Sequence, residues 1–155
     1  CDGEEISSVI RTEELSALAS RVSRFVPIRH ALKFQQRQLV EQAKIGGAYR
    51  GAVLEGRDIG TVVLPKADCK FFVEASPETR ARRRFAELQA KDPGVRFEYV
   101  LEALKQRDEQ DCNRSEAPLH KAANAILVDT SNLNVEQVLS VLEQHLRPFL
   151  LTESS

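Results

Sequence analysis

Short apolar runs, each bounded by turn residues and separated by longer segments, constrain the fold of this chain most strongly. Three runs have this character and lie at 52–54, 69–73 and 125–128. Apolar runs of this length are typical of strands buried on both faces of a parallel sheet. Parallel strands need long crossover connections, which are usually helices. The sequence therefore predicts an α/β fold in which helices flank a parallel sheet.

The segments before and between these runs carry helical signals. Thr12 precedes two glutamates, Pro27 suits the first turn of a helix, and Ser76-Pro77-Glu78 is a helix start. Apolar residues then recur at spacings of three and four. We expect helices at about 13–25, 27–46, 77–90, 97–112 and from 135 onward.

The predicted sheet is incomplete at its N-terminal side. It has three strands, whereas doubly wound sheets commonly have about five. The chain does not begin with methionine and contains none. We expect residues 1–46 to form a helical region, 47–151 the α/β core, and 152–155 a frayed tail.

Composition narrows the class of protein. The apolar stretches fall far below the roughly 20 residues that span a membrane. The net charge of −1 lacks the basic excess of a nucleic-acid-binding domain. Three widely spaced cysteines fit neither a disulfide framework nor a zinc site, and the histidines are scattered. We expect a cytoplasmic monomer with no bound metal of its own and no nucleic-acid or membrane partner.

Charged side chains gather in two places. Residues 55–61 place Glu, Arg and Asp directly after a predicted strand, and two glycines there suggest a tight backbone around a bound group. Arg107, Asp111 and Arg114 share one face if their helix continues through Arg114. Because ligands of such sheets bind at the carboxyl ends of the strands, we expect both clusters to converge there. An exposed, salt-bridged surface explains the second cluster equally well.

Several short motifs occur in order along the chain. They are IRTEE (10–14), ASRV (19–22), VPIRHAL (26–32), GRDIGTVVLP (56–65), ASPE (75–78), RARRR (80–84), RDEQDCNR (107–114) and APL (117–119). In this order they resemble the bacterial cytidylate kinase family over residues 3 to about 147. The resemblance implies a nucleoside-monophosphate-kinase fold that transfers the terminal phosphoryl group of ATP to CMP or dCMP, with Mg²⁺ arriving on ATP. The sequence holds no Gly-x-x-x-x-Gly-Lys-Ser/Thr phosphate loop.

The resemblance also implies which residues read the acceptor nucleotide. Asp58 accepts the exocyclic amine of cytosine, Arg29 faces ring atoms N3 and O2, and the Ser20 hydroxyl assists. Asp111 accepts a hydrogen bond from the ribose hydroxyls. The arginines implied around the phosphates are Arg11, Arg57, Arg107 and Arg114. A fold-stabilising ion pair between Arg29 and Asp58 is the alternative.

The arginine run at 80–84 resembles part of the family's mobile lid, expected at about 80–96. We expect Arg82 to face solvent, because adjacent helix residues diverge. The arginines expected to stabilise the transferred charge are Arg57, Arg80, Arg84 and Arg107.

The segment after the last predicted strand is expected to contact ATP. Asp129, Thr130 and Ser131 are implied at the adenine site, although a plain strand-to-helix turn explains them equally well. The leading hypothesis is a (d)CMP kinase that turns over little in this form, because it has no phosphate loop. The alternatives are a non-catalytic nucleotide-binding or interaction module and a phosphate-loop kinase for another small substrate.

Overall fold

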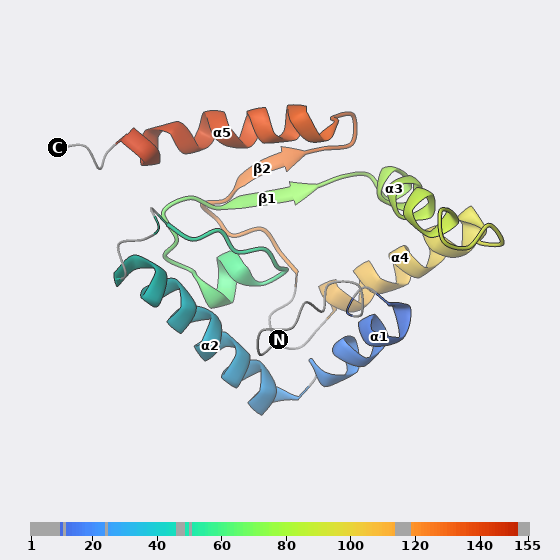
Figure 1. Ribbon diagram of the computed structural model, residues 1–155, viewed down its shortest axis with the longest axis horizontal. Helices are drawn as coiled ribbons and strands as arrows, with labels where there is room; N and C mark the ends of the chain where they lie inside the picture. The colour runs from blue at the N-terminus through green and yellow to red at the C-terminus, as the bar shows by residue number, and fades with distance from the viewer. Residues whose placement is uncertain are drawn as a thin grey trace. The chain divides into compact units, whose positions relative to one another are not determined.

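The computed structural model describes residues 10, 12–23, 25–45, 49, 51–113 and 119–151. The chain divides into two compact units, Cys1–Val53 and Leu54–Ser155. Figure 1 labels their elements. They are α1 (Glu13–Val22) and α2 (Val26–Ile45) in the first unit, and η1 (Ile59–Val63), β1 (Phe71–Glu74), α3 (Pro77–Gln89), α4 (Phe97–Cys112), β2 (Ile126–Asp129) and α5 (Val135–Leu151) in the second.

The first unit contains the two predicted helices. The Thr12 hydroxyl accepts a hydrogen bond from the Leu15 backbone N–H at 3.3 Å and so caps α1. This helix ends at Val22, three residues before the predicted end. Helix α2 begins at Val26, with Pro27 in its first turn, where a missing N–H costs nothing. Both helices are therefore confirmed, with a shorter α1.

The second unit is built on two parallel strands. Phe71 lies opposite Ile126, and Glu74 lies opposite Asp129. Hydrogen bonds from Ile126 N to Lys70 O and from Thr130 N to Glu74 O, both 2.8 Å, close the two ends of the ladder. Helix α5 runs beside the strands (Figure 1). The ring of His145 on this helix meets that of Phe71 edge-on, with centroids 6.3 Å apart. The prediction of a parallel sheet flanked by helices is confirmed.

The strand expected at 52–54 is not formed, so that prediction is wrong. Residues 51–55 have no regular secondary structure, and Val53 is 98% exposed. A strand needs a neighbour for its backbone N–H and C=O groups. Over the described ranges the sheet consists of β1 and β2, and neither pairs with this run. Without a partner strand, this apolar run has no regular secondary structure.

Helices α3 and α4 pack against each other. Ser76 caps α3 by accepting from Thr79 N at 3.1 Å, as the sequence predicts. The rings of Phe85 and Phe97 meet edge to face, with centroids 5.9 Å apart and an interplanar angle of 90°. Helix α4 ends at Cys112, as the sequence predicts.

Helix α5 begins at a reciprocal cap. Gln137 N donates to Asn134 Oδ1, and Asn134 N donates to Gln137 Oε1, both at 2.9 Å. Each side chain thus satisfies a backbone donor that the first helical turn leaves unpaired. None of the helices in the described part of the chain combines the length and apolar character that a membrane span needs.

Candidate functional site

The loop that leads into η1 carries Arg57 and Asp58. The Asp58 carbonyl accepts from Val62 N at 2.8 Å and from Val63 N at 3.1 Å, which closes a single wide turn of π-helix. Such turns are rare and often occur at functional sites. The wide turn fixes the direction in which the preceding arginine leaves the backbone.

One of the two glycines in this loop is closely packed. A Cβ at Gly56 would lie 2.9 Å from Ile59 Cγ1, which is closer than a real Cβ comes. A Cβ at Gly60 would lie 3.5 Å from Lys70 Cδ, an ordinary contact. The tight backbone that the sequence suggests is therefore seen at Gly56, where the close neighbour is a side chain of the protein itself.

Lys70 anchors the segment that follows η1. The residue is only 8% exposed, and its ammonium donates to Pro65 O and to Asn124 Oδ1, the latter at 2.9 Å. Pro65 follows η1, whereas Asn124 precedes β2. One buried cation thus joins two segments that are distant in sequence, and its hydrogen bonds offset part of the cost of burial.

Arg57 forms an ion pair with Asp111 in the last turn of α4. The arginine side chain is 35% exposed, but the carboxylate is only 2% exposed. A carboxylate removed from water requires a cation or several donors in contact. The structure therefore brings the loop cluster and the helix cluster together, as the sequence predicts for these two residues. Because little of Asp111 is accessible here, its predicted contact with ribose requires that Arg57 move aside.

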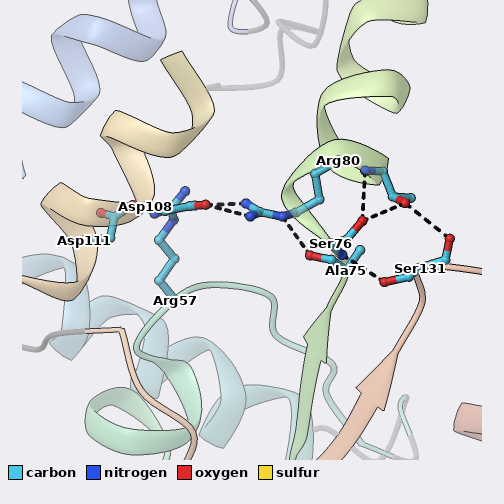
Figure 2. A network of polar contacts seen from close by, with 8 residues as sticks. Arg57, Ala75, Ser76, Arg80, Asp108, Asp111 and Ser131 are labelled. Atoms are coloured by element: carbon cyan, nitrogen blue, oxygen red, sulfur yellow. Dashed lines mark hydrogen bonds and ion pairs between the residues drawn. The ribbon is translucent and has the colours of Figure 1, made fainter. Parts of the chain in front are cut away.

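Arg80 forms a second ion pair beside the first (Figure 2). Its terminal nitrogens donate to the two carboxylate oxygens of Asp108 at 2.9 and 2.6 Å, and its Nε donates to Ala75 O at 3.1 Å. The hydrogen bond with Asp108 is the main cause that raises the pKa of Arg80 above its ordinary value, and burial opposes it. This paired, fork-like contact is the geometry in which a guanidinium binds a carboxylate most firmly.

One face of α4 supplies both carboxylates. Val100 is buried, Leu104 is half-buried, and Asp108 and Asp111 follow at helical spacing on the same side. Arg107 is exposed. The inward face therefore presents two acids to two arginines from other segments, whereas the predicted catalytic Arg107 lies toward solvent.

The other arginines of α3 serve different contacts. Arg83 donates to Thr130 Oγ1 at 3.1 Å, to Thr130 O at 2.6 Å and to Leu133 O at 3.1 Å. Arg84 pairs with Glu87 one turn along at 3.1 Å, at the surface. Arg82 is exposed, as expected. Of this run, Arg80 is the member that joins the network of Figure 2.

The turn after β2 is held by hydrogen bonds of its own. Asp129 Oδ1 accepts from Ser131 Oγ at 2.6 Å and from Ser131 N at 2.9 Å, and these bonds lower the pKa of Asp129. Thr130 Oγ1 donates to Glu74 O at 3.0 Å. Ser131 Oγ accepts from Ser76 N at 2.8 Å, which ties the turn to the start of α3. These contacts account for the three residues as a strand-to-helix turn, and their role at adenine stays a prediction.

Comparison with known proteins identifies the family. The model of the cytidylate kinase family matches residues 1–147. This chain belongs to the cytidylate kinase family. Among curated cytidylate kinases, the protein of Nitratidesulfovibrio vulgaris strain Hildenborough is 45% identical over 147 residues, which are 95% of this chain and 60% of the relative. That of Thermosipho melanesiensis is 46% identical over 138 residues, 89% of this chain and 60% of the relative.

The matched part of these relatives is smaller than their full length. A third relative, from Citrifermentans bemidjiense, is 45% identical over 142 residues, which cover 92% of this chain and 58% of the relative. The chain thus spans about 60% of the length of the cytidylate kinases that it matches. The activity of a whole cytidylate kinase is therefore a proposal for this protein.

Some residues expected to bind CMP in this cytidylate kinase family member lie outside the described residues or belong to different units. Arg11 and Arg114 lie outside the described residues, as does the side chain of Ser20. Arg29 is half-buried on α2 in the first unit, whereas Asp58 belongs to the second. The cytosine pocket built from them stays a prediction.

Sequence reasoning missed two residues of the site. Asp108 was overlooked because its neighbours Arg107 and Asp111 fit a charge ladder, although Val100 and Leu104 at four-residue spacing indicate the inward face that it shares. Arg83 carries no signal that separates it from the other arginines of α3. Across the described ranges, no group of three or more His, Cys, Asp or Glu side chains is arranged to hold a metal ion.

Proposed function

We propose that this protein transfers the terminal phosphoryl group of ATP to CMP or dCMP. The observation that carries the proposal is the pair of adjacent contacts, Arg57 with Asp111 and Arg80 with Asp108, in a chain of the cytidylate kinase family. Phosphoryl transfer depends mainly on alignment of the two phosphates and on neutralisation of their charge. Preorganised guanidinium groups supply both.

In this proposal, the pocket selects cytosine by placing one hydrogen-bond acceptor beside several hydrogen-bond donors. In this proposal Asp58 accepts the exocyclic amine, Arg29 donates to N3 and O2, and Ser20 adds a hydroxyl. Uracil would turn a carbonyl toward Asp58 and leave the carboxylate unpaired, at a cost of about 1–3 kcal/mol. The site should therefore prefer CMP to UMP.

The phosphates are held by arginines from several segments. Arg57 has five N–H donors, so it can keep a bond to Asp111 while it binds an oxygen of the monophosphate. Once Arg57 has shifted toward the phosphate, Asp111 accepts a hydrogen bond from the ribose hydroxyls. The remaining arginines proposed around the phosphates are Arg11, Arg80, Arg84, Arg107 and Arg114.

ATP is the donor substrate in this proposal. The turn of Asp129, Thr130 and Ser131 borders its adenine, and the lid at 80–96 covers its phosphates. Mg²⁺ accompanies ATP and is held by phosphate oxygens and water, as is usual for this ion. Closure of the lid would exclude water from the transferred group.

A substrate series tests the activity. Release of ADP by the full-length protein is measured with CMP, dCMP, UMP and AMP, and we expect turnover with the two cytidine nucleotides. Asp58→Asn should abolish the preference for CMP over UMP. Asp68→Asn, which removes an exposed carboxylate of the same unit, is the matched control. Equal rates on CMP, UMP and AMP would refute cytosine selection.

A nucleotide-binding module is the second candidate, since the same arginine–carboxylate contacts would also hold a nucleotide without transferring its phosphoryl group. Calorimetric titration of CMP, with and without ATP, separates the two functions. Binding of CMP that ATP does not change supports the module. Binding that ATP strengthens supports the kinase.

A further inference from the structure

We propose that Asp108 is a positioning residue for phosphoryl transfer and acts by orienting Arg80. The inference rests on the proposed kinase function. It concerns a carboxylate that neither the motif pattern nor the family match assigns. Among the ion pairs of the described ranges, Asp108 takes part in the one with Arg80.

The geometry restrains the Arg80 guanidinium at three points. Two bonds run to the Asp108 carboxylate and the third runs from Nε to Ala75 O. A guanidinium is planar and has five N–H donors, so these bonds fix its plane and leave two donors for an incoming oxyanion. A group held in this way reaches the phosphates without a search through side-chain rotamers.

The ion pair of Arg80 with Asp108 is one of several contacts between α3 and α4. The rings of Phe85 and Phe97 also meet edge to face between these helices, and Ala81 on α3 and Val100 on α4 are buried. Loss of the carboxylate should therefore release Arg80 while α3 and α4 remain packed. An opposite function is a latch, in which Asp108 withholds Arg80 from the substrate; the three-point contact favours positioning, because a latch would have to break all three bonds.

Single-turnover kinetics of the full-length protein test the proposal. We expect Asp108→Asn to slow phosphoryl transfer about 10- to 100-fold, because small misplacements of a catalytic group are costly. The KM for CMP should change little. Asp108→Glu should recover part of the rate, since it keeps the charge. Glu102→Gln, which removes an exposed carboxylate of the same helix, should leave the rate unchanged.

A double variant gives the decisive comparison. If Asp108 acts through Arg80, Asp108→Asn should cause little further loss in a protein that already carries Arg80→Gln. If the wild-type protein is active and its Asp108→Asn variant transfers the phosphoryl group at the normal rate, the inference is overturned while the proposed function stands. A variant faster than the wild type would also overturn the inference and would show that Asp108 is a latch. A wild-type protein that phosphorylates no nucleoside monophosphate would overturn the proposed function and the inference with it. Thermal unfolding of each variant shows whether a lost rate reflects a lost fold.

Discussion

Arg57 and Asp111 form an ion pair in which the carboxylate is almost completely removed from water, at 2% exposure. The arginine leaves the loop before η1, and the aspartate belongs to the last turn of α4. The carboxylate alone would be costly here, because a buried charge without a partner loses its hydration without compensation. The pair therefore links the stability of the second unit to the geometry of the proposed phosphate site.

Removal of Arg57 should destabilise the protein. Arg57→Met removes a cationic partner of the buried Asp111 carboxylate, and we expect the free energy of unfolding to fall by about 2–4 kcal/mol. Denaturation in urea measures the change. Adding Asp111→Leu to this variant should restore part of the loss, because no buried charge then remains. A single Arg57→Met variant as stable as the wild type would contradict the account.

Arg83 should stabilise the turn after β2. Arg83→Ala removes three hydrogen bonds to Thr130 and Leu133, and we expect a loss of about 1–3 kcal/mol. The Leu133 amide, which donates to Thr130 O at 3.2 Å, should exchange its hydrogen faster. Arg82→Ala, at an exposed neighbouring position, is the control. Equal exchange in the two variants would show that Arg83 does not hold the turn.

Asp129 should make the protein sensitive to acid. Hydrogen bonds from Ser131 lower the pKa of Asp129 in the folded state below the ordinary value of 3.8. Its contribution to stability is therefore complete above the unfolded pKa and is lost as the pH falls through the lowered folded pKa. Urea unfolding between pH 6 and about 2 should show a shallower acid decline in Asp129→Asn than in the wild type. Asp68→Asn should keep the wild-type decline.

Cys69 should react more slowly than Cys112. Burial raises the pKa of the Cys69 thiol, and a hydrogen bond with the backbone of Lys70 only partly opposes this effect. Cys112 is exposed. Because the thiolate is the reactive form, alkylation by iodoacetamide at pH 8, followed by mass spectrometry in a Cys1→Ser background, should modify Cys112 first. Faster labelling of Cys69 would contradict this assignment.

The fold was largely predictable where local signals coincide. Thr12, Ser76 and Asn134 each combine a capping side chain with an apolar periodicity, and a helix begins directly after each of them. The parallel pairing of β1 with β2 also followed from two apolar runs and the helices between them. The run at 52–54 is also apolar but forms no strand, because pairing depends on a neighbouring strand that the local sequence does not contain.

The candidate site was predictable in its residue types and less so in its contacts. The clusters that contain Arg57 and Asp111 were expected to converge at the edge of the sheet, but the ion pair between these two residues was not predicted. The pairing of Arg80 with Asp108 could not be predicted. The rotation of α4 against α3 decides whether Arg107 or Asp108 faces inward. Packing of Phe85 on Phe97 and burial of Val100 decide that rotation.

The sequence by itself determined the order of the helices and strands, the family, and which arginines and acidic residues lie near the strand ends. These properties depend on residues close together along the chain, where periodicity and capping chemistry act. The tertiary structure alone decided that Arg57 pairs with Asp111, that Arg80 pairs with Asp108 and that Arg83 holds the turn after β2. Charges select partners by distance and burial, and both are set only when the helices and the sheet have packed.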